Sequence, residues 1–339
     1  MPMRAPPKPP ASQVWSGKRR MPSDHFDGRR FFNPTLKPDF APSLPMLSRM
    51  LREPRNGWPR TIENTGVPRL HGPLDRDEIA ITFVGHATFL IQFDGLAILT
   101  DPVWSNRAGP FNLTGPRRVR EPGVAFEALP NIDLVLLSHN HYDHLDKATL
   151  KALRHAFDPA ICFAAGDMRL IRPFGFRDMR ELDWWDEAHF DSGLKITFTP
   201  AQHSSARGLH DRHRSLWGGA MIESRGRRIY FCGDSGYAPH FTDIRARLGA
   251  PDIALIPIGA YEPRWFMTPI HMNPSEAVQA HRDLESRQSI GMHHGTFQLT
   301  TEAIHQPVID LKAALAEHGV DERAFVTQPE GETVVYRVP

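Results

Sequence analysis

Short apolar runs that end in turn-forming or polar residues recur along the chain from residue 79 onward. The runs 79–84, 88–93 and 96–100 predict three strands, because Gly85 and the Asp94-Gly95 pair between them favour tight turns. Further strands are predicted at 132–137, 195–199, 228–232, 252–258 and 289–292.

Helices are predicted after and between these strands. Leu150, Leu153 and Phe157 follow helical spacing. The segment 273–276, Asn-Pro-Ser-Glu, opens a helix that runs to about residue 285, with Asn as the N-cap and Pro at the first helical position. A last helix is predicted from about 307 to 318. Groups of strands with helices between them predict an α/β domain in which helices lie outside two packed sheets.

The first 76 residues differ in composition from the rest of the chain. Residues 1–20 are rich in proline and basic residues, which predicts a disordered tail. Residues 21–76 combine many prolines with more apolar side chains than a free tail would carry, and they predict an irregular N-terminal arm packed on the main domain. Simple packing is the expected role of the arm, with a pocket wall or a homodimer contact as alternatives. Residues 77–339 are predicted to form the main domain.

Composition limits the class of protein. The net charge is +1, from 40 basic and 39 acidic residues, which gives no sign of a nucleic-acid partner or an anionic membrane. Cys162 and Cys232 cannot form a disulfide framework and are expected to be buried. The chain shows neither a signal-peptide core nor a run of about 18 apolar residues. We therefore expect a cytoplasmic enzyme, with membrane contact at most peripheral.

The segment 138–146 carries the strongest chemical signal. His139, His141, Asp143 and His144 fall within six positions, directly after the predicted strand 132–137. His139 and His141 share one side of an extended segment, and Asp143 and His144 follow as the chain turns. Four ligands with two directions of approach suit two metal ions better than one. The mixed nitrogen and oxygen donors suit zinc, with manganese or iron as alternatives.

Ligand-type residues follow other predicted strands in the same way. Asp101, His203, Asp234 and His293 each lie at the downstream end of an apolar run. Strand ends from neighbouring strands share one edge of a sheet, so we expect these side chains to meet the 139–144 cluster. Each residue alone is weak evidence, and their joint occurrence predicts a metal site.

Beyond the metal motif, longer segments carry a resemblance to a known family. The pattern His139-x-His141-x-Asp143-His144 resembles the signature of the metallo-β-lactamase superfamily. Within that superfamily, the segments 231–237, 257–267 and 293–297 are similar to the N-acyl-phosphatidylethanolamine-hydrolysing phospholipase D group, with a weaker echo at 32–34. The resemblance covers about Asp77 to the C-terminus.

The resemblance implies a four-layer αββα sandwich with two zinc ions at one edge. It implies that His139, His141 and His203 hold one zinc. It assigns Asp143, His144 and His293 to the other, with Asp234 as the bridge. Asp101 would orient ligand imidazoles. His271 would lie near the scissile phosphate, so Asp143 and His271 are the expected catalytic residues.

The implied reaction is hydrolysis of a phosphodiester in a phospholipid or related amphiphile. Two cations would lower the pKa of a bridging water and neutralise phosphate oxygens. Arg264 is a candidate phosphate ligand, and Tyr261, Trp265 and Phe266 are candidate walls for acyl chains. In the same zone Ile270 and His294 depart from the glutamine and tryptophan of the animal enzymes.

Three alternatives remain open at this point. The same site could hydrolyse a lactone, a sugar phosphate or a cyclic phosphodiester, since fold does not fix the substrate. A nuclease is the second alternative, disfavoured because the chain lacks a clustered basic stripe. The third is a metal-binding protein without catalysis, which the apparently complete ligand set makes the weakest.

Overall fold

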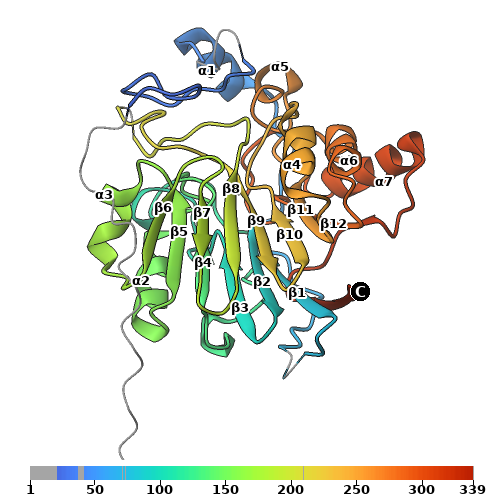
Figure 1. The fold of residues 1–339 in the computed structure, drawn as a ribbon. Coiled ribbons are helices and arrows are strands. Elements are labelled where there is room, and N and C mark those ends of the chain that lie inside the picture. The colour runs from blue at the N-terminus through green and yellow to red at the C-terminus, as the bar shows by residue number, and fades with distance from the viewer. Residues whose placement is uncertain (1–20, 37–41, 71, 73, 209, 339) are drawn as a thin grey trace, which may run out of the picture.

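The computed structural model describes residues 21–36, 42–70, 72, 74–208 and 210–338 (Figure 1). The tail predicted at 1–20 lies outside these residues. Two seven-stranded sheets form the centre, in the orders β14-β1-β2-β3-β4-β5-β6 and β13-β12-β11-β10-β9-β8-β7. Both are mixed sheets, with parallel pairing at β3-β4-β5-β6 and at β10-β11-β12-β13.

The strands of the first sheet are β1 (Glu78–Gly85), β2 (Thr88–Phe93), β3 (Leu96–Thr100), β4 (Leu134–Leu136), β5 (Ala160–Ala164), β6 (Met179–Leu182) and β14 (Thr333–Arg337). Those of the second are β7 (Glu187–His189), β8 (Lys195–Thr199), β9 (Gly219–Ser224), β10 (Arg227–Phe231), β11 (Ile253–Pro257), β12 (Gln288–Met292) and β13 (Phe325–Val326). The α-helices are α1 (Leu44–Arg52), α2 (Lys147–Ala156), α3 (Met168–Ile171), α4 (His240–Leu248), α5 (Arg264–Met267), α6 (Pro274–Asp283) and α7 (Gln306–His318).

Helices cover the outer faces of the two sheets. In Figure 1, α2 and α3 flank the first sheet, and α4, α6 and α7 lie on the other side of the molecule, against the second. The predicted αββα sandwich is therefore confirmed.

The strands are apolar on both faces because both faces are covered. In β2, Phe89, Ile91 and Phe93 join a core that lies between the sheets and includes Phe198 and Phe231 of the second sheet. The intervening Leu90 joins a second core, which contains Leu150 and Leu153 of α2. Alternate residues thus serve different layers, as the two-residue repeat of a strand requires.

Local sequence signals begin and end the helices that border the site. Asp146 caps α2, accepting a hydrogen bond from the backbone N–H of Ala148 at 3.0 Å. Asn273 and Glu276 form a capping box at the start of α6. Gly319, at a φ of 65°, ends α7. The chain segments that carry site residues are therefore anchored at defined helix termini.

Most of the described part of the arm has no regular secondary structure, apart from α1. Met50 of α1 packs against Phe266 and Met267 of α5. Phe26 and Phe31 join the core between the sheets. The arm is thus continuous with the main domain in its packing.

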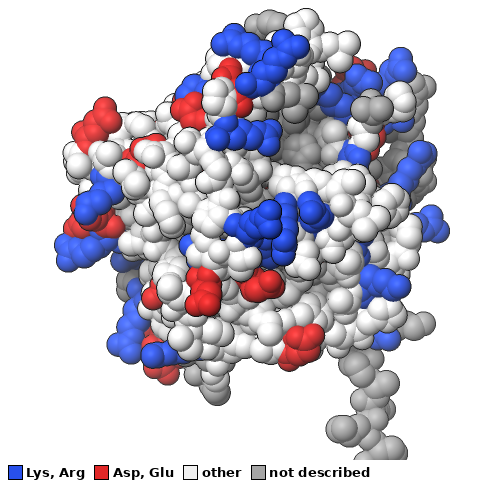
Figure 2. Space-filling view, turned by 180° about the vertical axis from the view of Figure 1, so that it is seen from behind, with Lys and Arg blue, Asp and Glu red and all other residues white. Residues whose placement is uncertain are grey.

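The surface carries both signs of charge. Figure 2 shows basic and acidic side chains interspersed on the face opposite to the view of Figure 1, in keeping with a net charge of +1. None of the helices formed by the described residues combines the length and apolarity that a bilayer crossing requires.

The capping box of α6 gives a first prediction. Asn273→Ala removes the acceptor for the Glu276 N–H, and we expect it to lower the free energy of unfolding by about 1 kcal/mol. Asn273→Asp keeps an equally good cap and should stay within a few tenths of a kcal/mol of the wild type. Denaturant unfolding of the three proteins measures this, and equal losses in both variants would contradict the capping role.

Candidate metal centre

The ligand-type residues predicted from strand ends meet at one edge of the sandwich. The loop after β4 delivers the cluster 139–144, and the loops after β8, β10 and β12 deliver His203, Asp234 and His293. All of these side chains are buried or half-buried, so bulk water has little access to their ligand atoms. They fall into groups of ligand atoms that lie within 4.8 Å of one another.

The first group consists of His139, His141 and His203. Nδ1 of His141 lies 2.9 Å from Nε2 of His139 and 3.2 Å from Nε2 of His203. Burial lowers the pKa of His141 to about 4 and of His203 to about 3, and that of His139 lies well below its ordinary value. These three imidazoles are neutral at pH 7, which is the form that binds a metal ion.

The second group contains Asp143, His144 and His293, and it also contains His86. Oδ2 of Asp143 lies 2.9 Å from Nε2 of His86, 3.4 Å from Nε2 of His144 and 3.5 Å from Nε2 of His293. Sequence reasoning missed His86, which directly follows the apolar strand β1. The same strand-end signal points to His86, although Gly85 before it indicates only a turn.

Asp234 lies between the two groups. Its Oδ2 is 3.1 Å from Nε2 of both His144 and His293, 3.6 Å from Nε2 of His203 and 3.9 Å from Nε2 of His139. Its Oδ1 is buried and has no hydrogen-bond partner among the residues that the structure describes. One carboxylate therefore faces both groups, as a bridging ligand would.

The charges of the cluster compensate one another. Burial opposes ionisation of Asp143 and Asp234, but the neighbouring histidines hold the pKa of both carboxyls well below the usual range. Burial likewise opposes protonation of His144 and His293. The surrounding carboxylates, Asp234 first, nevertheless raise the pKa of His293 to about 9 and that of His144 well above its ordinary value.

This donor set fits divalent metal ions. Nε2 of His144, Nε2 of His293 and Oδ1 of Asp234 are buried and lack hydrogen bonds among the described residues. Buried polar atoms without partners are rare unless a ligand satisfies them. Cations would also replace the protons that now balance the two carboxylates.

Asp101 holds the cluster from behind. It accepts hydrogen bonds from Nδ1 of His144 at 2.6 Å, from the Ser138 backbone N–H at 2.8 Å and from the Ser138 hydroxyl at 2.5 Å. Ser138 Oγ in turn lies 2.9 Å from Nδ1 of His139. Asp101 thus fixes which nitrogen of His144 faces the cluster.

The backbone is strained around the cluster. His86, Asp101 and His293 have φ angles of 58°, 31° and 63°, and the His293 N–H donates to the His86 carbonyl at 2.8 Å. Gly233, just before Asp234, has a φ of 62°, and a Cβ there would lie 2.5 Å from the Gly218 carbonyl oxygen. Such strain persists where the surrounding structure fixes it, as at functional sites.

The arm contributes to the site through Asn33. Its side-chain amide donates to the His203 carbonyl at 2.9 Å and accepts from the His203 N–H at 3.1 Å. The segment 32–34 was singled out in the sequence only as a weak resemblance. Its physical role, a clamp on the backbone of a ligand residue, depends on tertiary contact.

His271 lies beside both groups. Its ring centroid is 4.9 Å from that of His203 and 5.3 Å from that of His293, and its Nδ1 has no hydrogen bond to any residue that the structure describes. Burial keeps the pKa of His271 well below the ordinary value even though the carboxylate of Asp234 acts in the opposite direction. His271 is therefore a neutral imidazole with a free nitrogen.

The four residues proposed from sequence to bind substrate have protein partners. Arg264 makes two hydrogen bonds to Glu276, at 2.8 and 3.0 Å, and one to the His271 carbonyl at 3.0 Å. The Tyr261 hydroxyl donates to Asp310 at 2.5 Å, Trp265 Nε1 donates to Glu53 at 2.9 Å, and Phe266 packs in the cluster with Met50. Arg264 thus supports the backbone of His271, and the substrate-binding roles stay predictions.

Known proteins share this fold and sequence. A family model described as a beta-lactamase superfamily domain matches residues 97–294. An N-acyl-phosphatidylethanolamine-hydrolyzing phospholipase D 1 of Caenorhabditis elegans is 40% identical over 263 residues, which cover 74% of this chain and 74% of that protein. The mitochondrial phospholipase D of the same description from Saccharomyces cerevisiae is 31% identical over 305 residues, 86% of this chain and 64% of that protein. An isothiocyanate hydrolase from Delia radicum gut bacteria has a TM-score of 0.62 at 24% identity, over 76% of this chain and 99% of that one, which shows the shared fold.

The position of Asp234 yields a prediction on metal content. We expect about two metal ions per chain in protein given excess zinc, measured by elemental analysis. Asp234→Ala should weaken both sites because its carboxylate faces both groups. His203→Ala should weaken one. One ion or none in the wild type would contradict a dinuclear centre.

Metal loading should release protons. The pKa of His293 is about 9, and that of His144 lies well above its ordinary value. Both imidazoles are therefore protonated at pH 7 in the metal-free chain, whereas an imidazole that binds a metal ion must be neutral. We expect roughly two protons released per loaded chain, and an apparent affinity that rises with pH up to about 9. Calorimetric titration of chelator-treated protein in buffers of different ionisation enthalpy measures the number. Heats that are independent of the buffer would contradict it.

Proposed function

This chain belongs to the beta-lactamase superfamily and is a metal-dependent hydrolase, and we propose that its reaction is the hydrolysis of a phosphodiester bond at a dinuclear zinc centre. The preferred substrate is N-acyl-phosphatidylethanolamine or a related phospholipid, cleaved as a phospholipase D would cleave it. The observation that carries the proposal is the position of Asp234, whose single carboxylate faces both ligand groups.

Zinc is the preferred metal because of the donor types. The two groups offer imidazole nitrogens and carboxylate oxygens without thiolates, since both cysteines are buried elsewhere and free. Zinc accepts this set, and manganese or iron would accept it as well. The proposed ligands are His139, His141 and His203 for one ion, and Asp143, His144 and His293 for the other.

The cations would supply charge that stabilises the phosphate oxygens in the transition state and would lower the pKa of a water molecule. The chain itself supplies orientation and proton handling. Asp101 and Ser138 fix the ring planes of His144 and His139. His271, neutral and with a free nitrogen beside both groups, can hydrogen-bond a phosphate oxygen or the leaving oxygen.

Arg264 acts through His271 in this proposal. Its guanidinium bridges the Glu276 carboxylate and the His271 carbonyl, which fixes the backbone that carries the imidazole. Ile270, where the animal enzymes have glutamine, contributes its carbonyl to Nδ1 of His203 at 2.9 Å. That contact uses the backbone, so the departure at 270 leaves the support of His203 intact.

The phospholipid substrate rests on the relatives. Two of them, from Caenorhabditis elegans and Saccharomyces cerevisiae, are described as hydrolysing N-acyl-phosphatidylethanolamine. The apolar cluster of α1 and α5, in which Met50 packs against Phe266 and Met267, borders the segment that leads to His271 and is a candidate contact for acyl chains.

The role of His271 can be tested by substitution. His271→Ala should lower kcat by roughly a hundredfold or more, because a positioned proton donor or acceptor is lost. Metal content should stay at the wild-type level. A variant that loses a metal ion would show that His271 is a ligand, which its position near His203 and Asp234 also permits. Unchanged kcat and metal content would exclude both roles.

Acyl-chain length tests the substrate. Burial of a methylene contributes about 0.8 kcal/mol, so four added carbons in a groove should raise kcat/KM by roughly two hundredfold. We expect kcat/KM for soluble N-acyl phosphodiesters, assayed below the critical micelle concentration, to rise with length until the groove is full. Lactones and cyclic phosphodiesters assayed in parallel are the comparison. A response that is flat with chain length, together with faster turnover of a lactone, would overturn the lipid substrate and leave the metal centre standing.

A further inference from the structure

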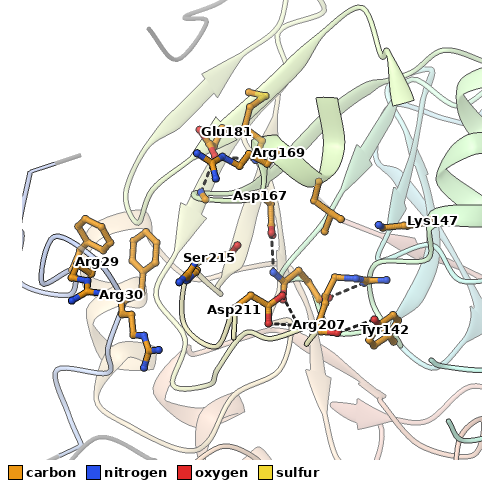
Figure 3. A pocket seen from close by; sticks show the side chains of 17 residues that line it. Arg29, Arg30, Tyr142, Lys147, Asp167, Arg169, Glu181, Arg207, Asp211 and Ser215 are labelled. Atoms are coloured by element: carbon orange, nitrogen blue, oxygen red, sulfur yellow. Dashed lines mark hydrogen bonds between the residues drawn. The ribbon is translucent and has the colours of Figure 1, made fainter. Parts of the chain in front are cut away.

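A cavity of about 740 Å³ lies beside the metal-ligand loop (Figure 3). Its walls come from five places: the arm at 26–31, the loop and helix start at 140–147, the segment 166–170 after β5, Glu181 of β6, and the segment 207–215. Asn140 and Tyr142 line it, but none of the seven predicted ligands does. The cavity is therefore a separate space behind the loop whose other side carries the histidines.

The cavity has an excess of positive charge. Three acidic and six basic residues line it, and the basic ones are Arg29, Arg30, Lys147, Arg169, Arg207 and Arg214. In Figure 3, Arg29 and Arg30 approach from the arm on one side, and Lys147 stands on the opposite side. The net charge of the whole chain is only +1, so this excess is local.

The acidic residues of the cavity neutralise this charge only in part, and none of them forms an ion pair with the described basic residues that line it. Glu181 accepts from the backbone N–H groups of Gly166 at 2.7 Å and Met168 at 3.2 Å. Asp211 accepts from those of Arg207 at 3.1 Å and Gly208 at 2.8 Å. Within the part of the chain that the structure describes, none of the six basic residues forms an ion pair. The six cations thus lack a directly paired carboxylate, although the charges of Asp167 and Asp146 act on Arg207.

Arg207 is the most enclosed of these cations. Its guanidinium lies 3.9 Å from the centre of the Tyr142 ring and donates to the carbonyls of Asn140 and Leu145, both at 2.8 Å. Burial, and then the charge of Arg207, lower the pKa of Lys147. Two cations therefore repel one another across the cavity wall, and an anion between them would relieve this repulsion.

The deep end of the cavity offers acceptors. Asn140 is only 4% exposed, and its Oδ1 has no hydrogen-bond partner within the described part of the chain. Its Nδ2 donates to Asp167 at 2.8 Å, and burial raises the pKa of Asp167 to about 7. An unpartnered buried acceptor of this kind calls for an O–H or N–H donor on a ligand.

We propose that this cavity is a binding site for a phosphate monoester that carries a hydroxyl or other donor group. Arginine side chains form two parallel hydrogen bonds to phosphate oxygens. A phosphate dianion also neutralises more of the positive charge in the cavity than a carboxylate does. The volume falls within the range of about 300–1,000 Å³ that small-molecule sites occupy. Phe26, Phe31, Met168 and Leu170 add apolar wall, so the ester can be soluble or the head of a lipid.

The site would communicate with the metal loop through the backbone. Arg207 holds the carbonyls of Asn140 and Leu145, which flank the ligands His141, Asp143 and His144. A phosphate ester held against Arg207 and Asn140 stiffens this loop from the side away from the metals. This inference concerns binding and is independent of the hydrolytic reaction proposed above.

Calorimetric binding to the metal-loaded full-length protein tests the proposal. The probes are inorganic phosphate, glycerol 3-phosphate and dihexanoyl phosphatidate below its critical micelle concentration. The double variant R169Q/R214Q removes two exposed cavity cations that make no described side-chain contact. The matched control, R60Q/R282Q, removes the same charge from exposed positions outside the cavity. A second pair, R29Q/R30Q, tests the arm.

We expect glycerol 3-phosphate to bind the wild type and to lose about tenfold or more in affinity in both cavity variants, with the control within about twofold. Metal content should be equal in all four proteins. Phosphatidate that binds more tightly than glycerol 3-phosphate, and competes with it, assigns the site to a lipid head; equal affinities assign it to a soluble ester. Equal affinities in the wild type, cavity variants and control would place all binding at the metal centre and overturn the proposal, as would the absence of binding by all three probes.

Discussion

The rest of this structure depends on the need to compensate the buried carboxylate of Asp234. It stands within 4 Å of the Nε2 atoms of four histidines that come from both sheets. A buried charge is costly unless it is paired, so the edge of the sandwich must supply compensating groups around it. The histidines do so as protonated imidazoles or as holders of cations. Six of the buried side-chain atoms that lack a hydrogen-bond partner among the described residues belong to the metal-ligand groups, which agrees with this requirement.

The surrounding structure holds these charges at fixed positions. Asp101 and Ser138 orient imidazoles from the first sheet, Asn33 clamps the backbone of His203 from the arm, and Arg264 supports His271 from α5. These contacts come from parts of the chain far apart in sequence. The strained φ angles of His86 and His293 are stable in this setting because the two backbones hydrogen-bond each other at 2.8 Å. Precise placement of ligands thus depends on packing from every layer of the fold.

The loop 139–144 has two working faces. Its histidines and Asp143 face the metal groups, while Asn140 and Tyr142, at alternating positions, face the basic cavity. Residues 141–144 form a turn in which the N–H groups of His144 and Leu145 donate to the His141 carbonyl, so the motif that builds the metal centre also presents two other residues on its far side. Arg207 connects to the backbone between these faces. The metal centre and the cavity therefore share one short piece of chain.

Local pattern was enough to predict the strands that bury both faces and the ligands that follow them. β2, β3 and β8 begin and end where the apolar runs do. The metal ligands His139, His141, Asp143 and His144 could be predicted because they lie close together in the sequence itself. The sequence pattern missed β5, β6, β7, β9, β13 and β14, as well as α1, α3, α4 and α5. β9 begins at Gly219, and a glycine in a sequence usually indicates a turn. Here a Cβ would lie 2.5 Å from the Phe231 carbonyl oxygen, so the glycine allows two strands to lie close together. Only the tertiary structure brought His86 to Asp143, Asn33 to His203 and Arg264 to Glu276, and only it brought six cations to the walls of one cavity. Periodicity reports which face of an element is buried, but it carries no information on which distant side chain will lie opposite, because that depends on how the layers pack.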